Sequence, residues 1–305
     1  MSVVVIGSYA KALVITANRI PGEGETVLGT NYRETFGGKG SDMAVQAARL
    51  GAVVAYIGVV GDDNFGREFI ALMHQEGINT DGLRTSPDKP TGVGFIVKDT
   101  QGRNCIVVDM GANALLGHAD IDAANASIRN AKVVLAQLEI PLETALYGLR
   151  QAKAAGATTI LNPAPAVDLS HLDLRTVDIL TPNQTEARIA AGLPPDAVVS
   201  NEQVARRLLA TGCGAVVMTL GHAGVQIFTS EDDLRVPPYP VKVIDSNGAG
   251  DSFNAGLATA LAEGQSLASA VRFANAVAAL CCTRWETVPS YHRRADVEAF
   301  LTSAA

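Results

Sequence analysis

The feature that most constrains the fold is the regular alternation of short apolar runs with segments of helical periodicity. The apolar runs have the length of strands buried on both faces, and the helical segments mostly end at a glycine. This alternation predicts a mainly parallel sheet with helices on both faces, a three-layer α/β fold. The expected strands are 3–7, 53–61, 133–139, 158–165, 177–183 and 215–221, and the expected helices are 41–51, 64–77, 142–156 and 201–212.

Two segments break the alternation. Residues 11–36 and 91–109 are half polar and have the pattern of antiparallel strand pairs, the second turning at "DTQGR" (99–103). We expect them to form a small sheet attached to the main one, either as a lid or as ordinary edge strands. The whole chain, 1–305, is expected to form a single α/β domain that carries this lid.

Composition excludes several classes of partner. The net charge of −7 opposes nucleic-acid binding, which needs a basic face, and is also unfavourable at an anionic membrane. No apolar stretch approaches the roughly 20 residues that cross a bilayer. The four cysteines lack CxxC spacing and the five histidines are scattered, so no metal-ligand cluster is predicted. The N-terminus lacks a basic region before its short apolar run, and we expect a reduced, cytoplasmic protein.

One glycine-rich turn stands out as a candidate anion site. In parallel sheets ligands lie beyond the carboxyl ends of the strands. The turns at 5–12 and 36–42 lack the dinucleotide and P-loop spacings. The segment "SNGAGDSFNAG" (246–256) follows a strand-like approach at 241–244 and opens a helical run, so its N–H groups favour an anion. Asp251 in the first turn is either an acid that complements the helix dipole or a general base.

Six motifs occur in an order that resembles ribokinase and the wider PfkB-type carbohydrate kinase family. The resemblance runs through nearly the whole chain, and the glycine–Asp motif and the GGKG turn are its most specific parts. It implies the ATP-dependent transfer of a γ-phosphoryl group to a hydroxymethyl group of a pentose or related sugar. The motifs are "GGKG" (37–40), "QLEIPLE" (137–143), "LNPAPA" (161–166), "TPNQTE" (181–186), "TLGHAG" (219–224) and "DSNGAGDSFNAG" (245–256).

The resemblance also implies roles for single residues. Asp251 takes the proton of the attacking hydroxyl, and the amides from Gly248 through Ala249 and Gly250 to Asp251 form an anion hole. The sugar is expected to contact Gly38, Lys39, Asp42, Glu139 and Asp251. The nucleotide is expected at Asn183, Thr219, Gly221, Gly224 and Asn275.

Two cations are implied by the same resemblance. Asn183 and Glu186 match a motif that organises Mg²⁺ and phosphate, commonly through water, although the same pair is close to a helix capping box. Asp245 and nearby carbonyls match a K⁺ site. Its C-terminal part differs here, because "TRWET" (283–287) places Glu286 near the position of a usual glycine.

The sugar end departs from the ribokinase pattern. Ala10 and Ala12 stand where an Asn and an Asp usually hold the ribose hydroxyls, and Asp42 replaces an Asn. A buried hydroxyl without its partner costs roughly 1–3 kcal/mol, so ribose binding is expected to be weakened. Alanines also leave room for a bulkier or less hydroxylated substrate. Lys11, between them on a strand, is expected to point to the other face.

Three functions therefore remain open. The leading one is an ATP-dependent carbohydrate kinase, with a sugar and ATP as its partners. The alternatives are a nucleoside kinase of the same superfamily and a catalytically silent nucleotide- or sugar-binding regulator. The lid-like strands are expected to pair with those of a second copy in a homodimer.

Overall fold

The computed structural model describes residues 2–101 and 103–304, and its centre is a mixed sheet of nine strands. The strand β1 (Ser2–Ile6) lies inside this sheet, parallel to both neighbours. Its side chains alternate between two cores: Val3 and Val5 face one, and Val4 and Ile6 face the other. A strand buried on both faces explains the unbroken apolar run "VVVI". The sheet order is β13-β12-β11-β10-β9-β8-β1-β4-β5, and only the pairs β11–β12 and β12–β13 are antiparallel.

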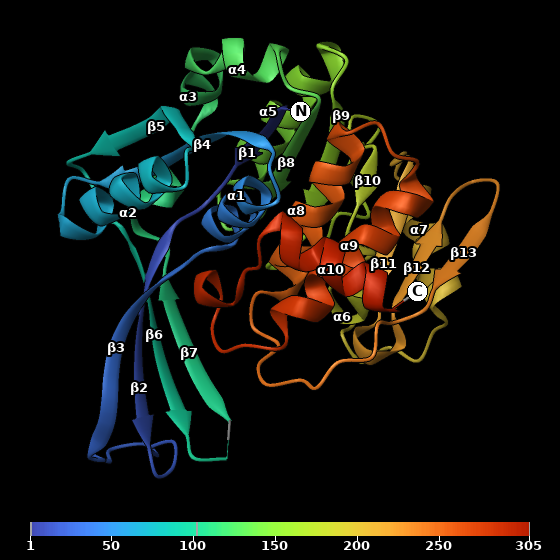
Figure 1. Cartoon of the computed structure of the whole chain (residues 1–305). Coiled ribbons are helices and arrows are strands. Elements are labelled where there is room, and N and C mark those ends of the chain that lie inside the picture. Colours follow the sequence, from blue (N-terminus) through green and yellow to red (C-terminus); the bar gives the residue numbers. More distant parts are fainter. Residues whose placement is uncertain (1, 102, 305) are drawn as a thin grey trace.

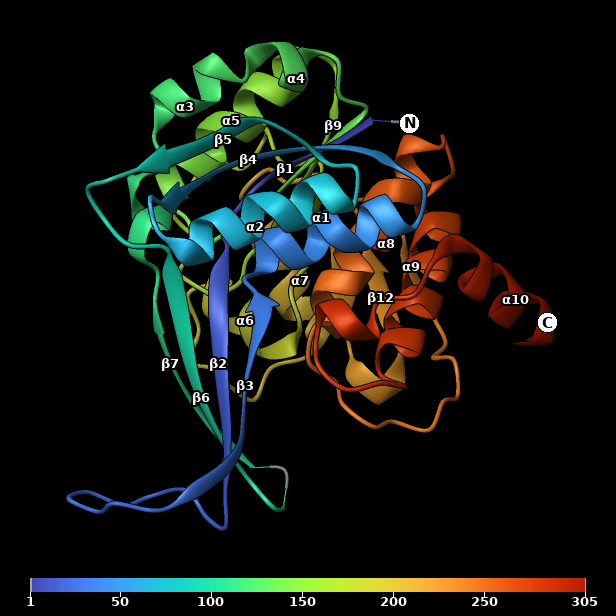
Figure 2. The ribbon, with the colours of Figure 1, turned by 60° about the vertical axis from the view of Figure 1, so that its left-hand side comes forward.

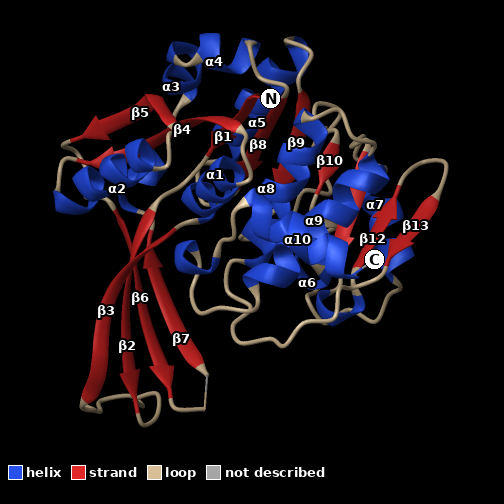
Figure 3. Cartoon of the chain, in the orientation of Figure 1, coloured by secondary structure: helices blue, strands red, loops and turns tan. Residues whose placement is uncertain are grey.

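Helices cover both faces of the sheet, so the three-layer prediction is confirmed (Figure 3). One core contains buried residues of α1, α2, α8, α9 and α10, and the other contains residues of the helices α3 to α7. The longer helices are α1 (Lys39–Arg49), α2 (Asn64–Gln75), α5 (Leu142–Ala154), α7 (Asn201–Leu209), α8 (Ala249–Ala262), α9 (Leu267–Cys281) and α10 (Arg294–Ala304). The shorter ones are α3 (His118–Ala123), α4 (Asn125–Arg129) and α6 (Gln184–Ala190).

A second sheet of four strands projects from one end of the molecule (Figures 1 and 2). The two segments predicted to form a small sheet supply all its strands, in the order β3-β2-β6-β7. The pairs β2–β3 and β6–β7 are antiparallel, and β2 runs parallel to β6. The strands are β2 (Ala10–Ala17), β3 (Gly29–Gly37), β6 (Gly92–Asp99) and β7 (Asn104–Asp109). Part of the predicted turn at 99–103 lies outside the described residues, at position 102.

The six expected strands and four expected helices are all present, usually with shorter ends. The largest difference is at β10, which keeps only two residues of the expected 177–183. The prediction of a strand-like segment at 241–244 is wrong, because this segment is a loop in which Val243 and Ile244 are exposed. The Ile244 N–H donates a hydrogen bond to the Cys282 carbonyl rather than to a neighbouring strand. The main-sheet strands are β4 (Val53–Gly61), β5 (Asn79–Ser86), β8 (Val133–Gln137), β9 (Thr158–Asn162), β10 (Ile179–Leu180), β11 (Ala215–Thr219), β12 (Val225–Phe228) and β13 (Asp233–Val236).

Among the helices of residues 2–101 and 103–304, none combines the length and the apolar character needed to cross a bilayer.

Candidate active site

A cavity of about 210 Å³ lies between the second sheet and the main body. Residues from β2, β3, β6 and β7 form one side, and α1, α8 and the segment after β8 form the other. Six of the residues predicted from the sequence line it, although they come from three distant parts of the chain. They are Gly38, Lys39, Asp42, Glu139, Gly248 and Asp251.

The GGKG turn places Lys39 and Asp42 at the start of α1. Gly38 caps this helix with a φ of 92°, and a Cβ there would lie 2.8 Å from backbone atoms of Tyr9 and Ala10. Only glycine fits such a close approach with a positive φ. The turn therefore brings the first helical residues against the start of β2.

Glu139 ties this turn to the end of β8. One of its carboxylate oxygens, Oε2, accepts the Lys39 N–H at 2.8 Å and the Ser8 hydroxyl at 2.6 Å. Charge-assisted bonds of this kind fix the carboxylate. Glu139 thus holds three segments together at the rim of the cavity while its side chain lines that cavity.

The predicted anion site is the N-terminus of α8. Gly248 caps the helix with a left-handed φ of 75°, and a Cβ there would lie 2.7 Å from the Tyr291 hydroxyl oxygen. Ala249, Gly250 and Asp251 are the first three helical residues. The N–H groups of a first turn have no acceptor inside the helix, and the helix dipole makes this end positive.

Asp251 is a buried carboxyl at the cavity, and among the described residues one of its oxygens, Oδ1, is left without a hydrogen bond. Burial raises the pKa of Asp251 to about 6, against the opposing effect of the Lys39 ammonium. Lys39 Nζ lies 4.0 Å from this oxygen, and Asp251 in turn raises the pKa of Lys39. A carboxyl that ionises near neutrality suits a general base.

Asp42 is a second buried carboxyl beside the first. It is 3% exposed, and its Oδ1 also has no partner within the described residues. Burial, together with the negative charge of Asp251, holds the pKa of Asp42 well above its ordinary value. A buried, unsatisfied acceptor of this kind favours a ligand that donates a hydrogen bond.

The residues predicted to hold the nucleotide lie outside this cavity, with four of them at or just after the ends of β10 and β11 and Asn275 on α9. Asn183 and Thr219 form a parallel bridge. Gly221 and Gly224 flank a 3₁₀ turn and both have positive φ angles. Asn275 on α9 is largely buried, and its amide donates to the Pro237 carbonyl at 2.8 Å. This group therefore borders the carboxyl ends of the parallel strands, as expected of a ligand site in such a sheet.

Asn183 and Glu186 form the capping box of α6. The Asn183 side chain accepts the Glu186 N–H at 2.9 Å, and the Glu186 carboxylate accepts the Asn183 N–H at 2.8 Å. Burial raises the pKa of Glu186, and its charge in turn raises the pKa of Lys39 and of Asp251. In residues 2–101 and 103–304 no three His, Cys, Asp or Glu side chains cluster as metal ligands. A Mg²⁺ bound mainly by water and phosphate needs no such cluster, so the pair fits this ion.

The part of the second sheet nearest positions 10 and 12 is largely apolar. Ala10 and Ala12 line the cavity, as do Val14, Ile96 and Val108. Lys11 points to the other face, as predicted, and pairs with Glu34 and Glu68. Positions 10 and 12 themselves therefore offer no hydrogen-bonding side chain to a sugar, and the polar side chain nearest in register to Ala12 is that of Thr35.

Sequence reasoning missed several residues of the cavity. Asn247, Thr287 and Lys98 also line it. Lys98 could have been found from the two-residue period of a strand, because every second residue of β6, namely Gly94, Ile96 and Lys98, faces the cavity. Thr287 could not, because it reaches the cavity only through the packing of the C-terminal segment on β3, where its hydroxyl donates to the Phe36 carbonyl at 3.1 Å.

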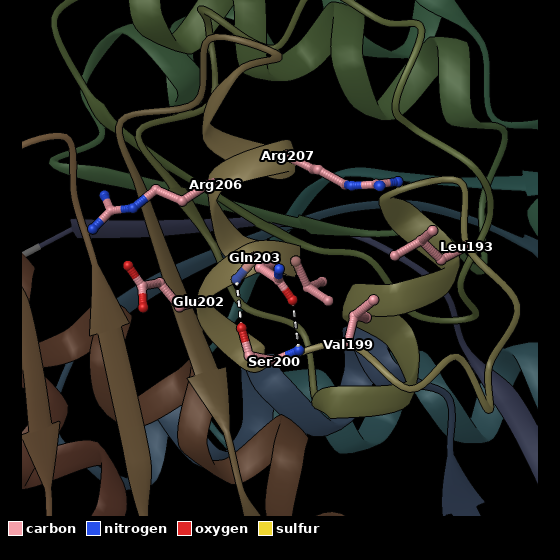
Figure 4. A pocket seen from close by; sticks show the side chains of 8 residues that line it. Leu193, Val199, Ser200, Glu202, Gln203, Arg206 and Arg207 are labelled. Carbon is pink, nitrogen blue, oxygen red and sulfur yellow. Dashed lines mark hydrogen bonds between the residues drawn. The ribbon is translucent and has the colours of Figure 1, made fainter.

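A wider hollow of about 660 Å³ lies elsewhere, at the start of α7 (Figure 4). Ser200 and Gln203 form a capping box there, and the side chains of Arg206 and Arg207 extend to opposite sides of the helix. None of the residues predicted for catalysis or binding lines it. We therefore place the candidate active site at the smaller cavity.

The chain is similar to known proteins over nearly its whole length. The ribokinase of Haemophilus influenzae is 37% identical over 304 residues, covering 98% of both chains. The deoxyribokinase of Salmonella typhi is 33% identical over 294 residues, covering 95% of both. A solved structure of Arabidopsis thaliana ribokinase complexed with ribose and ATP matches with a TM-score of 0.84 and 30% identity over 98% of both chains. The pfkB family carbohydrate kinase model matches residues 1–293, and the chain belongs to that family.

Proposed function

We propose that this protein transfers the γ-phosphoryl group of ATP to a hydroxymethyl oxygen of a pentose or a related sugar. The observation that carries the proposal is the position of Asp251, a buried carboxyl that faces the cavity beside the N-terminus of α8. Membership of a carbohydrate kinase family supports both the donor and the class of acceptor.

The residues of the chain divide the reaction between them. Asp251 accepts the proton of the sugar hydroxyl as that oxygen attacks phosphorus, which contributes roughly a factor of 100 to 10,000. The N–H groups at Gly250 and Asp251, with Lys39, stabilise the charge of the migrating phosphoryl group. Asn183 and Glu186 would hold Mg²⁺ through water, and the ion would supply further neutralisation of phosphate charge.

The cavity also bears on the substrate. Glu139 and Asp42 accept hydrogen bonds from sugar hydroxyls at one end, whereas the methyl groups of Ala10 and Ala12 offer them no partner. We propose a sugar with fewer hydroxyls on that side than ribose has. The similarity to a protein named deoxyribokinase supports this choice.

The second sheet is proposed to act as a lid that excludes water and so limits ATP hydrolysis. Its exposed apolar residues include Tyr32, Phe95 and Val107. Tyr32 and Val107 lie on its edge strands β3 and β7, where exposed apolar area favours pairing with a second copy. We propose a homodimer through this sheet, and a monomeric mass in light scattering at micromolar concentration would contradict it. The four cysteines are free thiols, which supports a cytoplasmic location.

ATP consumption measured against a panel of pentoses, deoxypentoses and nucleosides tests the function. We expect sugar-dependent turnover with a deoxypentose or pentose and a loss of 100-fold or more in Asp251→Asn. Turnover with nucleosides alone would establish the nucleoside kinase instead. ATP binding without turnover on any acceptor would establish the silent regulator.

A further inference from the structure

The carboxylate of Asp245 lies on the loop that leads into the anion site, three residues before Gly248. Its Oδ1 accepts the Asn247 N–H at 3.0 Å, and its Oδ2 accepts the Glu286 N–H at 3.1 Å. The same Oδ2 lies 3.7 Å from Lys98 Nζ. Both side chains of this ion pair are largely buried, at 16% and 10% exposure. Asp245 therefore already has a cationic partner from the protein itself.

This arrangement does not fit the K⁺ site that the family resemblance implies. A bound K⁺ needs several oxygen atoms that are free to face it, whereas Asp245 is shared between two N–H groups and an ammonium. Position 286 carries a glutamate at a φ of 72°, and its carboxylate pairs with Arg33 of β3. An ammonium beside Asp245 would also repel a second cation.

The ammonium is placed where it can act on the reaction. The side chain of Lys98 lines the same cavity as Asn247, Gly248 and Asp251. A positive charge there orients Asp245, and Asp245 holds the loop through the Asn247 N–H. That loop presents the N–H groups of α8 to the phosphoryl group.

The charge comes from the second sheet rather than from the main body. Lys98 is on β6, and Arg33, which pairs with Glu286, is on β3. Two cations of this sheet therefore contact two acids on the segments that flank the anion site. The anion site is completed only when the sheet lies over it.

We propose that the ammonium of Lys98 is the fixed cation of this active site and takes the place of K⁺, so that the enzyme needs no monovalent metal ion. Lys98 is a positioning residue, since it acts through Asp245. This inference rests on the proposed kinase function for its rate measurements, but its stability measurements do not depend on that function.

The first test compares turnover of the unaltered enzyme in potassium, sodium and choline chloride at equal ionic strength. We expect rates that agree within about twofold. Activation of tenfold or more by K⁺ would overturn the proposal.

The second test removes the ammonium. Lys98→Ala is expected to lower kcat in choline chloride by 10- to 100-fold, with a smaller change in KM. Potassium chloride is expected to restore part of the lost kcat, whereas additional choline chloride is not. Lys98→Arg keeps a cation and should retain most of kcat. Lys89→Ala, an exposed lysine before β6, is the matched control and should match the unaltered enzyme. Full activity of Lys98→Ala in choline chloride would overturn the proposal.

The third test needs no turnover. Potassium chloride is expected to raise the melting temperature of Lys98→Ala relative to choline chloride, and to leave that of the unaltered protein unchanged. Two outcomes would contradict the proposal that the Lys98 ammonium replaces K⁺. One is a K⁺-dependent rise in the melting temperature of the unaltered protein, and the other is the absence of any such rise in both proteins. If no acceptor supports turnover, this measurement still decides the role of Lys98.

Discussion

Lys39 Nζ lies 4.0 Å from Oδ1 of Asp251, across a cavity that neither residue could form alone. The ammonium partly offsets the cost of ionising a buried carboxyl, whose pKa still stays raised at about 6. The pair therefore holds a base that is charged at neutral pH but readily accepts a proton. The same lysine is placed to face the phosphate charge that appears during transfer.

The pH dependence of the rate should report this pKa. Because Asp251 must be ionised to act as a base, kcat/KM is expected to fall about tenfold per unit below pH 6, rather than below the ordinary carboxyl value near 4. Lys39→Met removes the charge that lowers the pKa of Asp251, so the acid limb should move to higher pH. Initial rates between pH 4.5 and 9 check both statements. A limb that stays in place in Lys39→Met would contradict the coupling.

The stability of Asp251→Asn should change in the direction opposite to its activity. A folded-state pKa of about 6 against an ordinary 3.8 means that ionisation of Asp251 destabilises the fold. The neutral amide removes that cost, so we expect a gain of up to about 3 kcal/mol in the free energy of unfolding above pH 6. The gain should shrink between pH 6 and 3.8 and vanish below. Urea unfolding at pH 8 and pH 4 measures it, and equal stability of the two proteins at pH 8 would refute the argument.

The sequence was sufficient to predict six of the nine strands of the main sheet, since each of the six has an apolar run that two cores require. It did not predict β5, β12 and β13, whose segments mix polar and apolar residues. It was also sufficient to predict that the GGKG turn and the glycine–Asp turn meet, through the family resemblance. It did not predict that β10 is short or that residues 241–244 form a loop. Both depend on which backbone groups find partners in the folded molecule, such as the bond from Ile244 to Cys282, and no local pattern records that choice.

The ion pairs around the cavity could not be predicted from the sequence, for a related reason. Lys98 lies on β6 of the second sheet, and its partner Asp245 lies on the loop before α8, 147 residues later in the chain. Charged residues on a strand usually face solvent, so a lysine at position 98 carried no signal by itself. The alternation on β6 indicates its face, but only the placement of the second sheet against the C-terminal segment indicates its partner.

The glycine at position 248 should be irreplaceable for reasons of shape. Gly248→Ala forces a methyl group against the Tyr291 hydroxyl oxygen and an alanine into the left-handed region, which alone costs roughly 1–2 kcal/mol. We expect a lower melting temperature and a lower kcat. Gly250→Ala is the control for stability, because a Cβ there meets no atom within 4 Å and the residue is helical; it should be neutral or stabilise by about 0.4–1 kcal/mol. Equal losses of stability in the two variants would contradict the steric argument.

The apolar wall at positions 10 and 12 should determine how the enzyme ranks its sugars. Restoring polar groups with Ala10→Asn, and with Ala10→Asn combined with Ala12→Asp, gives ribose hydroxyls their partners again. Each restored bond is worth roughly 1–3 kcal/mol, so the ratio of kcat/KM for ribose to that for a deoxyribose is expected to rise by about 5- to 100-fold per substitution. Val107→Asn adds the same amide to an exposed position that does not line the cavity, and it should leave the ratio unchanged. If the ratio stays constant in well-folded variants, the wall does not face the sugar and the preference for fewer hydroxyls has another origin.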